Sequence, residues 1–418
     1  DEPYWIDDEH FDLEYHVRHL ALPSPGDWRQ LCIQVARLVS RPLDAGKPLW
    51  EFNIIEGLDN VEGLPPGCFA VLMKIHHSMV DGKAGAELIS VLHDLSPSVD
   101  APAVSASTRV WKPKSTPSSL QLAATGLRRM AFKPGHALRV VARSMPGMIR
   151  HRGARKSKAK FRVPNTPLNG KITGARVFDA RFFELEEFKE LRSLVPGATI
   201  NDVALAVVSG AMRRYLMAKG QLPEDSLVTS VPISIRAADS ASVSEGNELI
   251  GQNVLLKTDL EDPVERLQAL CDVMNEAKAY VNAVGAKQLA DVSTAVPGSM
   301  TGLLARAMTT VAEMSGQSIM ANTVVTNVPG VQVPLYMNGA RALMMCGCGP
   351  LVFTMGTIHI VGSYCGQICI NITAARDLLP DPGFYADCID ASFKEYKEIL
   401  EASAAGKKPG KKRAARKR

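Results

Sequence analysis

No Asp or Glu occurs between Ala101 and Phe178 of this 418-residue chain, although that stretch holds 17 Lys and Arg residues. A second basic segment, Lys407 to Arg418, adds eight more and also lacks acids. The other 23 basic residues stand against all 43 acidic ones, so two basic modules are attached to an acidic body. Strand-like and helix-like runs alternate on both sides of the first module. This pattern predicts an α/β protein of two lobes, each a mixed sheet with helices, joined by a long crossover linker, with a cleft between the lobes.

The chain is long enough, and at 46% hydrophobic residues apolar enough, to bury a large core. The expected divisions are an N-terminal lobe, a basic linker with amphipathic helices, a C-terminal lobe and a disordered basic tail, at 1–96, 97–175, 176–402 and 403–418. Strands are expected at 51–58, 68–77, 176–183, 227–236, 252–260 and 321–328. Helices are expected at 82–95, 184–194, 202–220, 262–281 and 381–402.

Tandem histidines followed by Ser-Met-Val-Asp-Gly stand at the end of the apolar run 68–77. Imidazole is the side chain whose ordinary pKa suits proton transfer near neutral pH. If 68–77 is a strand, His76 and His77 point to opposite faces, so only one of them is expected to act on a substrate. His77 shares its face with Phe69, Val71 and other apolar residues, and is therefore the expected general base.

Asp81 and Gly82 follow the histidines at the start of the helical run 82–95. A carboxylate at a helix start can cap the helix and hold the turn that directs His77. Asp81 is therefore interpreted as a brace, and a direct part in proton transfer is the alternative.

A second unusual run, Ala342 to Ala375, has no charged residue. A membrane-spanning helix needs about 20 predominantly apolar residues. Here Gly and Pro interrupt the run repeatedly, which favours two or three buried strands with turns over a span.

The basic linker has three interpretations. Leu, Val, Met and Ala mixed with Arg in 120–132 and 137–149 are typical of helices that lie in a membrane interface. A solvated linker is the first alternative. A nucleic-acid patch is the second, and it is disfavoured because few aromatic residues lie among the basic ones.

The eight cysteines mostly lie in apolar segments, form no Cys-x-x-Cys pair and have no zinc spacing with histidine. They are expected to be reduced core residues of a cytosolic protein. The other histidines lack partners at metal-ligand spacing, and His10, His16 and His19 are placed in a polar N-terminal segment. No metal site is expected.

Six short motifs stand in order along the chain: PLWE at 48–51, HHSMVDG at 76–82, NDV at 201–203, VPISIR at 231–236, TNVPG at 326–330 and SYCG at 363–366. An early segment, FDLEYHVRHLALP at 11–23, precedes them. Together they resemble the bacterial wax ester synthase/diacylglycerol acyltransferase family, within the CoA-dependent acyltransferases related to chloramphenicol acetyltransferase.

The resemblance implies that the chain transfers a fatty acyl group from acyl-CoA, a co-substrate rather than a bound cofactor, to diacylglycerol or a long-chain alcohol. It gives the role of general base to His77 within the His76-His77 pair and makes Asp81 structural. Asn201 is interpreted as an amide donor to the oxyanion, with helix capping as the alternative. Supporting roles fall to Gly82, Asp202, Arg236 as an ion-pair partner of Asp81, and Trp50 as a packing residue.

No Gly-x-Ser-x-Gly sequence occurs, so direct attack with both substrates bound is expected instead of an acyl-serine route. Two departures from the family pattern stand out. Val331 replaces a proline that often follows NVPG, and members usually have several tens of residues before the FDLEYHVRH-like segment, so the N-terminal lobe is expected to lack its start.

Two other functions remain open: the same chemistry on another hydroxyl acceptor, or a catalytically silent coat protein of lipid particles. The protein is expected in the cytoplasm, peripherally associated with an anionic membrane or lipid inclusions through its basic linker and tail.

Overall fold

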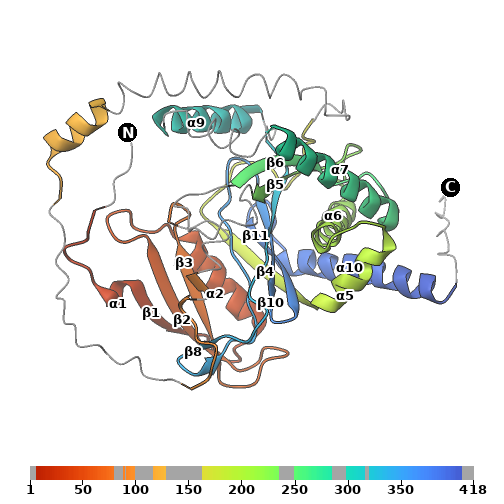
Figure 1. Cartoon of the computed structure of the whole chain (residues 1–418), viewed down its shortest axis with the longest axis horizontal. Coiled ribbons are helices and arrows are strands. Elements are labelled where there is room, and N and C mark those ends of the chain that lie inside the picture. The colour runs from red at the N-terminus through yellow and green to blue at the C-terminus, as the bar shows by residue number, and fades with distance from the viewer. Residues whose placement is uncertain are drawn as a thin grey trace.

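The computed structural model describes residues 6–79, 88–89, 91–98, 116–128, 162–234, 249–284, 298–315 and 320–406. Two sheets organise these residues (Figure 1). One has three strands near the N-terminus and the other has six, all from residue 176 onward. A small hairpin, β8 (Tyr336–Met337) and β9 (Ala340–Arg341), is separate from both.

The smaller sheet has β2 (Trp50–Leu58) at its centre. β1 (Val17–Ala21) pairs with it in parallel, and β3 (Cys68–Ile75) pairs with it antiparallel. A short helix, α1 (Leu13–His16), precedes β1, and α2 (Trp28–Ser40) connects β1 to β2. α2 starts at a capping box between Asp27 and Gln30, which satisfies backbone N–H groups in its first turn.

The larger sheet has the order β4-β11-β10-β7-β5-β6. Its strands are β4 (Arg176–Glu184), β5 (Val228–Ser234), β6 (Leu249–Leu255), β7 (Thr323–Val328), β10 (Thr357–Tyr364) and β11 (Gln367–Ala375). The three adjacent strands β10, β7 and β5 run parallel, while β11, β4 and β6 run antiparallel to their neighbours. The carboxyl ends of β5, β7 and β10 therefore lie at one edge of the sheet.

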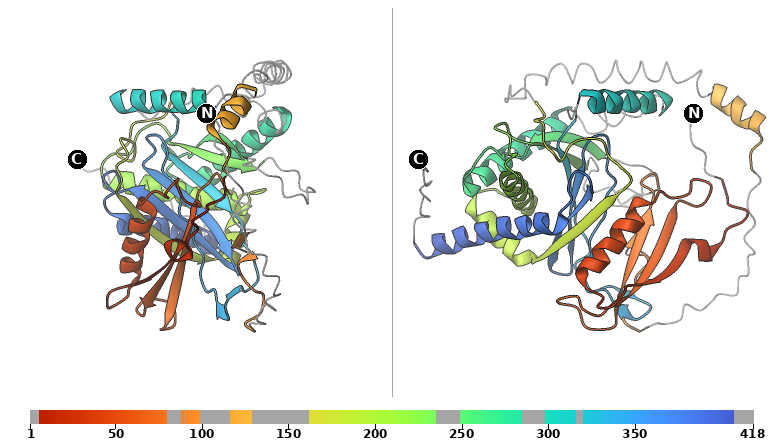
Figure 2. Two further views of the ribbon diagram at one scale, coloured as in Figure 1. Left: turned by 90° about the vertical axis from the view of Figure 1, so that its left-hand side faces the viewer. Right: turned by 180° about the vertical axis from the view of Figure 1, so that it is seen from behind.

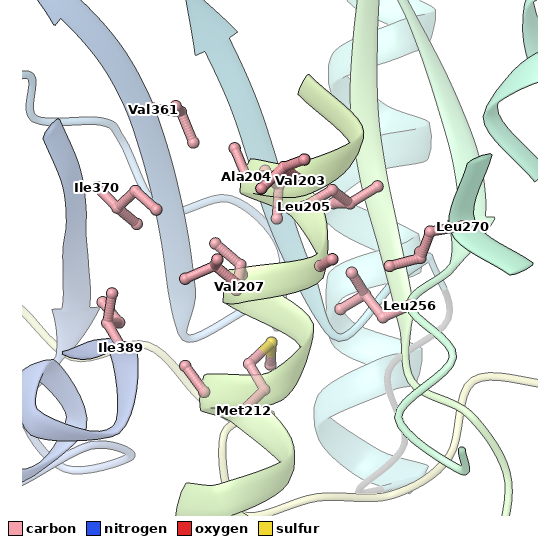
Figure 3. Close-up of a cluster of buried hydrophobic side chains, with 14 of the residues drawn as sticks. Val203, Ala204, Leu205, Val207, Met212, Leu256, Leu270, Val361, Ile370 and Ile389 are labelled. Atoms are coloured by element: carbon pink, nitrogen blue, oxygen red, sulfur yellow. The ribbon is translucent and has the colours of Figure 1, made fainter. Parts of the chain in front are cut away.

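Helix α6 (Ile200–Ala218) lies at the centre of the larger lobe, between the sheet and its neighbouring helices (Figure 1). Its residues Val203 to Met212 are all buried, because the helix is covered by α7 (Pro263–Val284), α10 (Pro382–Ala404) and the sheet. Figure 3 shows its apolar side chains facing Val361 and Ile370 of the sheet and Ile389 of α10. A helix that is apolar all round is stable only when buried in this way.

The remaining helices of the larger lobe are α5 (Leu185–Leu191), which continues as a 3-10 turn, η1 (Arg192–Leu194), and α9 (Gly298–Ser315). Figure 2 shows α9 at one extreme of the molecule, away from the central helix.

The two lobes meet where α2 packs against β4. Apolar residues of α2 and of the smaller sheet form one buried cluster with Phe178 and Ala180 of β4. The Trp28 indole N–H donates to Asp179 Oδ1 across 2.9 Å, which satisfies a carboxylate that is almost fully buried. This contact fixes the smaller sheet against the larger lobe.

The predicted fold class is confirmed: two mixed α/β lobes are present. The uncharged run contains the strands β10 and β11, and no described helix is long and apolar enough to cross a membrane. Several details of the prediction were wrong. β3 ends two residues earlier than expected, α6 begins two residues earlier, and β6 lies at Leu249–Leu255 instead of 252–260. Residues 92–95 of the helix expected at 82–95 are not helical, and α2 and α9 were not predicted. Of the linker helices, residues 119–128 are helical, and the second one lies outside the described residues.

Candidate active site

The tandem histidines lie in a turn directly after β3, not within the strand. Ile75, the last residue of β3, pairs with Trp50. The backbone N–H of His76 donates to the Leu49 carbonyl across 2.9 Å, and that of Met79 donates back to the His76 carbonyl across 2.9 Å. The PLWE segment therefore fixes the point at which the histidines leave the sheet. We had expected strand alternation to point the two side chains to opposite faces. That expectation was wrong, because β3 ends at Ile75, before the histidines.

The ring of His76 makes local contacts with Ser78. The backbone N–H of Ser78 donates to His76 Nδ1 across 3.2 Å, and Ser78 Oγ lies 2.7 Å from the same nitrogen. Since Nδ1 accepts a backbone N–H, the ring proton of neutral His76 resides on Nε2. Both histidine side chains are exposed.

Trp50 lies in an aromatic cluster beside this turn. The ring of His16 stacks on Trp50 with centroids 4.5 Å apart and on Phe11 at 5.3 Å, and the Phe11 and Trp50 rings lie 6.2 Å from each other. His16 Nδ1 lies 2.6 Å from the Trp50 carbonyl, so its N–H donates to that oxygen. His16 is fully buried, contrary to its expected place in a polar segment. The cluster holds the start of β2. Leu49, the residue before β2, accepts the backbone hydrogen bond of His76.

The Asn201-Asp202 pair lies in the first turn of α6. Thr199 is the N-cap: the Asp202 N–H donates to Thr199 Oγ1 across 3.3 Å, and the Thr199 N–H donates to Asp202 Oδ2 across 2.8 Å. This capping box satisfies the orphan backbone donors, so Asn201 is not the cap. The capping alternative for Asn201 is therefore wrong.

The side chain of Asn201 has a different partner. Asn327, in β7, donates from Nδ2 to Asn201 Oδ1 across 3.2 Å. The Asn201 amide is thereby oriented with its Nδ2 group as the end that can donate to another acceptor. This contact joins two of the sequence motifs, Asn-Asp-Val and Thr-Asn-Val-Pro-Gly, across 126 positions of the chain.

A third motif completes the same sheet edge. After β7, the Gly330 N–H donates to Ser363 Oγ across 3.2 Å, and the Gln332 side chain donates to the same oxygen across 3.0 Å. The Cys365 N–H donates to the Val331 carbonyl across 3.1 Å. A Cβ atom on Gly330 would lie 2.1 Å from the Ser363 carbonyl oxygen, so only glycine permits this approach. The segments after β7 and β10 are thus held together beside Asn201.

Three predicted residues, Asp81, Gly82 and Arg236, lie outside the described residues, so the pairing of Asp81 with Arg236 stays a prediction. The described part of the chain brings together Asn201 and the ends of β7 and β10, and it places the histidine turn on PLWE. It contains no group of three metal-ligating side chains.

Sequence reasoning missed three contributors: Thr199 as the cap, Asn327 as the partner of Asn201, and Gln332. Asn327 belongs to the Thr-Asn-Val-Pro-Gly motif that was identified from the sequence, and membership of that motif was the signal that could have marked it as a site residue. The partner itself was not visible, because a long-range side-chain pair leaves no local pattern.

His359 is a histidine in a very different environment. It is fully buried in β10, with Nε2 2.6 Å from the Tyr385 hydroxyl and Nδ1 3.1 Å from Thr323 Oγ1. Burial lowers the pKa of His359 to about 3, so the ring is neutral at physiological pH. It is a satisfied core residue.

All eight cysteines are free thiols; four of them are buried, whereas Cys346 is exposed.

Comparison with known proteins gives a consistent result. Residues 1–204 match the family described as the wax ester synthase/diacylglycerol acyltransferase catalytic domain, and residues 245–397 match its C-terminal domain. A protein of Mycobacterium tuberculosis named as a diacylglycerol O-acyltransferase is 32% identical over 97% of this chain and 78% of its own. The O-acyltransferase WSD of Acinetobacter baylyi is 32% identical over 90% of this chain and 79% of its own.

A solved structure agrees with these sequence matches. The wax ester synthase/diacylglycerol acyltransferase from Marinobacter aquaeolei VT8 is 26% identical, with a TM-score of 0.65, over 96% of this chain and 83% of its own. The two-lobed architecture and the order of its elements are therefore shared along nearly the whole chain.

Proposed function

The chain belongs to the wax ester synthase/diacylglycerol acyltransferase family and is an O-acyltransferase, and from that premise we propose that His77 is its general base. In the proposed reaction, a fatty acyl group passes from acyl-CoA to the hydroxyl of diacylglycerol or of a long-chain alcohol. The products are triacylglycerol or wax ester, and free CoA. The observation that carries the residue assignment is the hydrogen-bonding of the histidine turn.

His77 accepts the proton of the acceptor hydroxyl as that oxygen attacks the thioester carbonyl carbon. The new C–O bond forms first, giving a tetrahedral intermediate with a negative oxygen. Collapse of the intermediate breaks the C–S bond, and the CoA sulfur leaves with the proton that the His77 imidazolium returns. Both substrates are bound together, so no acyl-enzyme is formed.

The contacts of Ser78 support His77 over His76 as the base. Two groups of Ser78 lie against His76 Nδ1, and the proton on Nε2 leaves that nitrogen without a lone pair for a substrate. His76 would have to break both contacts to accept a proton. We assign His76 to holding the turn, and His77 to the reaction.

Asn201 is proposed as a donor to the oxyanion. Its Oδ1 is held by Asn327, which presents the amide hydrogens of Nδ2, and it lies in the first turn of α6, where the helix dipole also favours negative charge. Asp202 supports this geometry through the capping box with Thr199. Trp50 acts through packing, since it stacks on His16 rather than standing free.

The remaining motif residues keep the roles proposed from the family pattern. Asp81, with Gly82, holds the loop that follows the histidines, and Arg236 is its ion-pair partner. Arg236 follows β5, whose carboxyl end lies at the same sheet edge as Asn327.

The lipid acceptors suggest where the enzyme acts. We propose that the protein is cytoplasmic and associates peripherally with an anionic membrane or with lipid inclusions, through the acid-free segment 101–178 and the basic residues 407–418. Such an attachment is electrostatic and should weaken as salt is added.

The reaction is tested by following thiol release from palmitoyl-CoA with 1-hexadecanol, with 1,2-dioleoylglycerol and with no acceptor, and by identifying the lipid product. Release that depends on an acceptor and yields the matching ester supports the proposal. A palmitoylated protein formed without acceptor, detected as a mass increase, would contradict direct transfer. Equal release in all three samples would contradict acyl transfer to either alcohol.

A further inference from the structure

Helix α9 presents apolar side chains to solvent along one face. Leu303, Val311 and Met314 are 71%, 56% and 84% exposed, and Ala307 between them is also exposed. Their spacings of four, four and three residues place them on one side of an α-helix. Large apolar side chains scattered singly on a surface need no explanation, but four that are aligned on one helix form a continuous patch.

One polar group on this face, the Thr310 hydroxyl, has a partner within the helix. Thr310 is exposed beside Val311, yet its hydroxyl donates to the Arg306 carbonyl one turn earlier, across 3.0 Å. A threonine bonded in this way does not need water for its hydroxyl hydrogen. Only two residues of the whole helix, Arg306 and Glu313, are charged. The face can therefore leave water at little cost in unsatisfied hydrogen bonds.

The helical residues 119–128 repeat this pattern. Leu120 and Leu127 are 82% and 69% exposed, and with the exposed Ala124 they share one face at spacings of four and three. Thr125, also exposed, donates from its hydroxyl to the Gln121 carbonyl across 2.8 Å. Two helices that are far apart in sequence thus combine an exposed apolar face with a threonine hydroxyl directed to its own backbone.

Both helices lie at the same end of the molecule in all three views, with a gap between them (Figures 1 and 2). Each helix carries one exposed arginine, Arg306 in α9 and Arg128 in the other. In the sequence, the residues that follow Arg128, 129–161, carry ten further Lys and Arg and no acid. An apolar patch bordered by positive charge matches the surface of an anionic phospholipid bilayer, with acyl chains beneath negative headgroups.

We propose that α9 and residues 119–128 form a docking face for an anionic phospholipid bilayer. The proposal rests on the proposed function, because a diacylglycerol or fatty alcohol acceptor resides in lipid and must reach the enzyme from there. The apolar face of each helix enters the boundary between headgroups and acyl chains, while Arg128 and Arg306 contact phosphates. The docking face thereby brings the enzyme to its acceptor.

Co-sedimentation with vesicles of phosphatidylglycerol and phosphatidylcholine tests this docking. The double variants Leu303→Glu/Val311→Glu and Leu120→Glu/Leu127→Glu are compared with the full-length wild type. Met217→Glu is the matched control, since Met217 is a 54% exposed apolar residue on a different helix, α6. We expect each double variant to bind at least tenfold more weakly at low salt and the control to bind like the wild type.

Activity assays separate docking from catalysis. Thiol release is measured with a soluble pair, hexanoyl-CoA and 1-hexanol, and with dioleoylglycerol presented in vesicles. We expect the double variants to match the wild type on the soluble pair and to fall at least fivefold with vesicles. A wild type that is inactive on both would refute the proposed function, and vesicle binding alone would then decide the docking face.

Three results would overturn the docking proposal. The first is vesicle binding by both double variants equal to that of the wild type. The second is binding to a triacylglycerol emulsion without binding to bilayers, which would identify a neutral lipid surface instead. The third is a wild-type dimer that the Leu303→Glu/Val311→Glu variant converts to a monomer by light scattering, with vesicle binding unchanged, which would identify a second copy of the chain as the occupant.

Discussion

The Asn327 side chain donates to Asn201 Oδ1 across 3.2 Å, and so connects the end of β7 to the first turn of α6. If Asn201 stabilises the oxyanion, Asn201→Ala should lower kcat roughly a hundredfold or more with little change in KM. Asn327→Ala should lower kcat by about tenfold, because the amide remains but loses its orientation.

The double variant Asn201→Ala/Asn327→Ala should be no slower than Asn201→Ala alone, since Asn327 acts through Asn201. Asn275→Ala, an asparagine of α7, serves as the control and should retain wild-type kcat. Multiplicative losses in the double variant would show that the two residues act separately.

The capping box should matter for both stability and rate. Thr199→Ala removes the cap of α6 and should cost about 1 kcal/mol of unfolding free energy. It should also lower kcat more than it raises KM, because the first turn holds Asn201. Urea denaturation and steady-state kinetics check this prediction, and Thr199→Ser, which keeps the hydroxyl, should restore both values. A Ser variant as slow as the Ala variant would contradict the capping explanation.

Position 330, where the backbone of Gly330 lies against that of Ser363, should accept no residue other than glycine. A methyl group at position 330 would meet the Ser363 carbonyl at 2.1 Å, so Gly330→Ala should destabilise the protein by about 1–3 kcal/mol and reduce activity. Gly174→Ala is the matched control, because a Cβ there meets no atom within 4 Å. Thermal denaturation of the two variants should differ, and equal midpoints would refute this packing account.

Buried His359 should make the fold sensitive to acid. Its pKa is about 3 in the folded protein, whereas an unfolded chain protonates histidine near pH 6.5. Between these values only the unfolded state binds the proton, so stability is full above about pH 6.5 and falls as the pH drops toward 3. Lowering the pH from 7.5 to 5 should remove about 2 kcal/mol through this residue.

Urea midpoints at the two pH values test the contribution of His359. Between pH 7.5 and 5, the variant His359→Gln should lose less unfolding free energy than the wild type. The control His10→Gln, which changes an exposed histidine, should lose as much as the wild type. A loss in His359→Gln as large as in the wild type would exclude His359 as its source.

The sequence predicted those parts of the fold in which the local pattern and the buried structure agree. β2, β4 and α10 were predicted within two residues, because side-chain alternation and helical periodicity follow which faces are buried. The end of β3 was misplaced, since two histidines extend an apolar run that the backbone ends with a turn. α9 was missed because Gly298, Gly302 and three threonines weaken its helix signal, and because its apolar residues Leu303, Val311 and Met314 are exposed.

The candidate site was predicted as a set of motifs but not as an arrangement. Asn201 and Asn327 were both identified within motifs, yet their contact depends on how β7 and α6 are placed in space. The stacking of His16 on Trp50 was likewise invisible, because Trp50 is brought to it by the pairing of β1 with β2.

The most direct test of the account is acceptor-dependent thiol release from palmitoyl-CoA by the wild type and by the variants His77→Ala and His76→Ala. Removing the base should lower kcat for His77→Ala by about 10²–10⁴-fold and leave the remaining rate nearly independent of pH between 6 and 8. His76→Ala, which removes only a group that holds the turn, should lose much less. A His77→Ala enzyme with the wild-type rate and pH profile would contradict the general-base assignment.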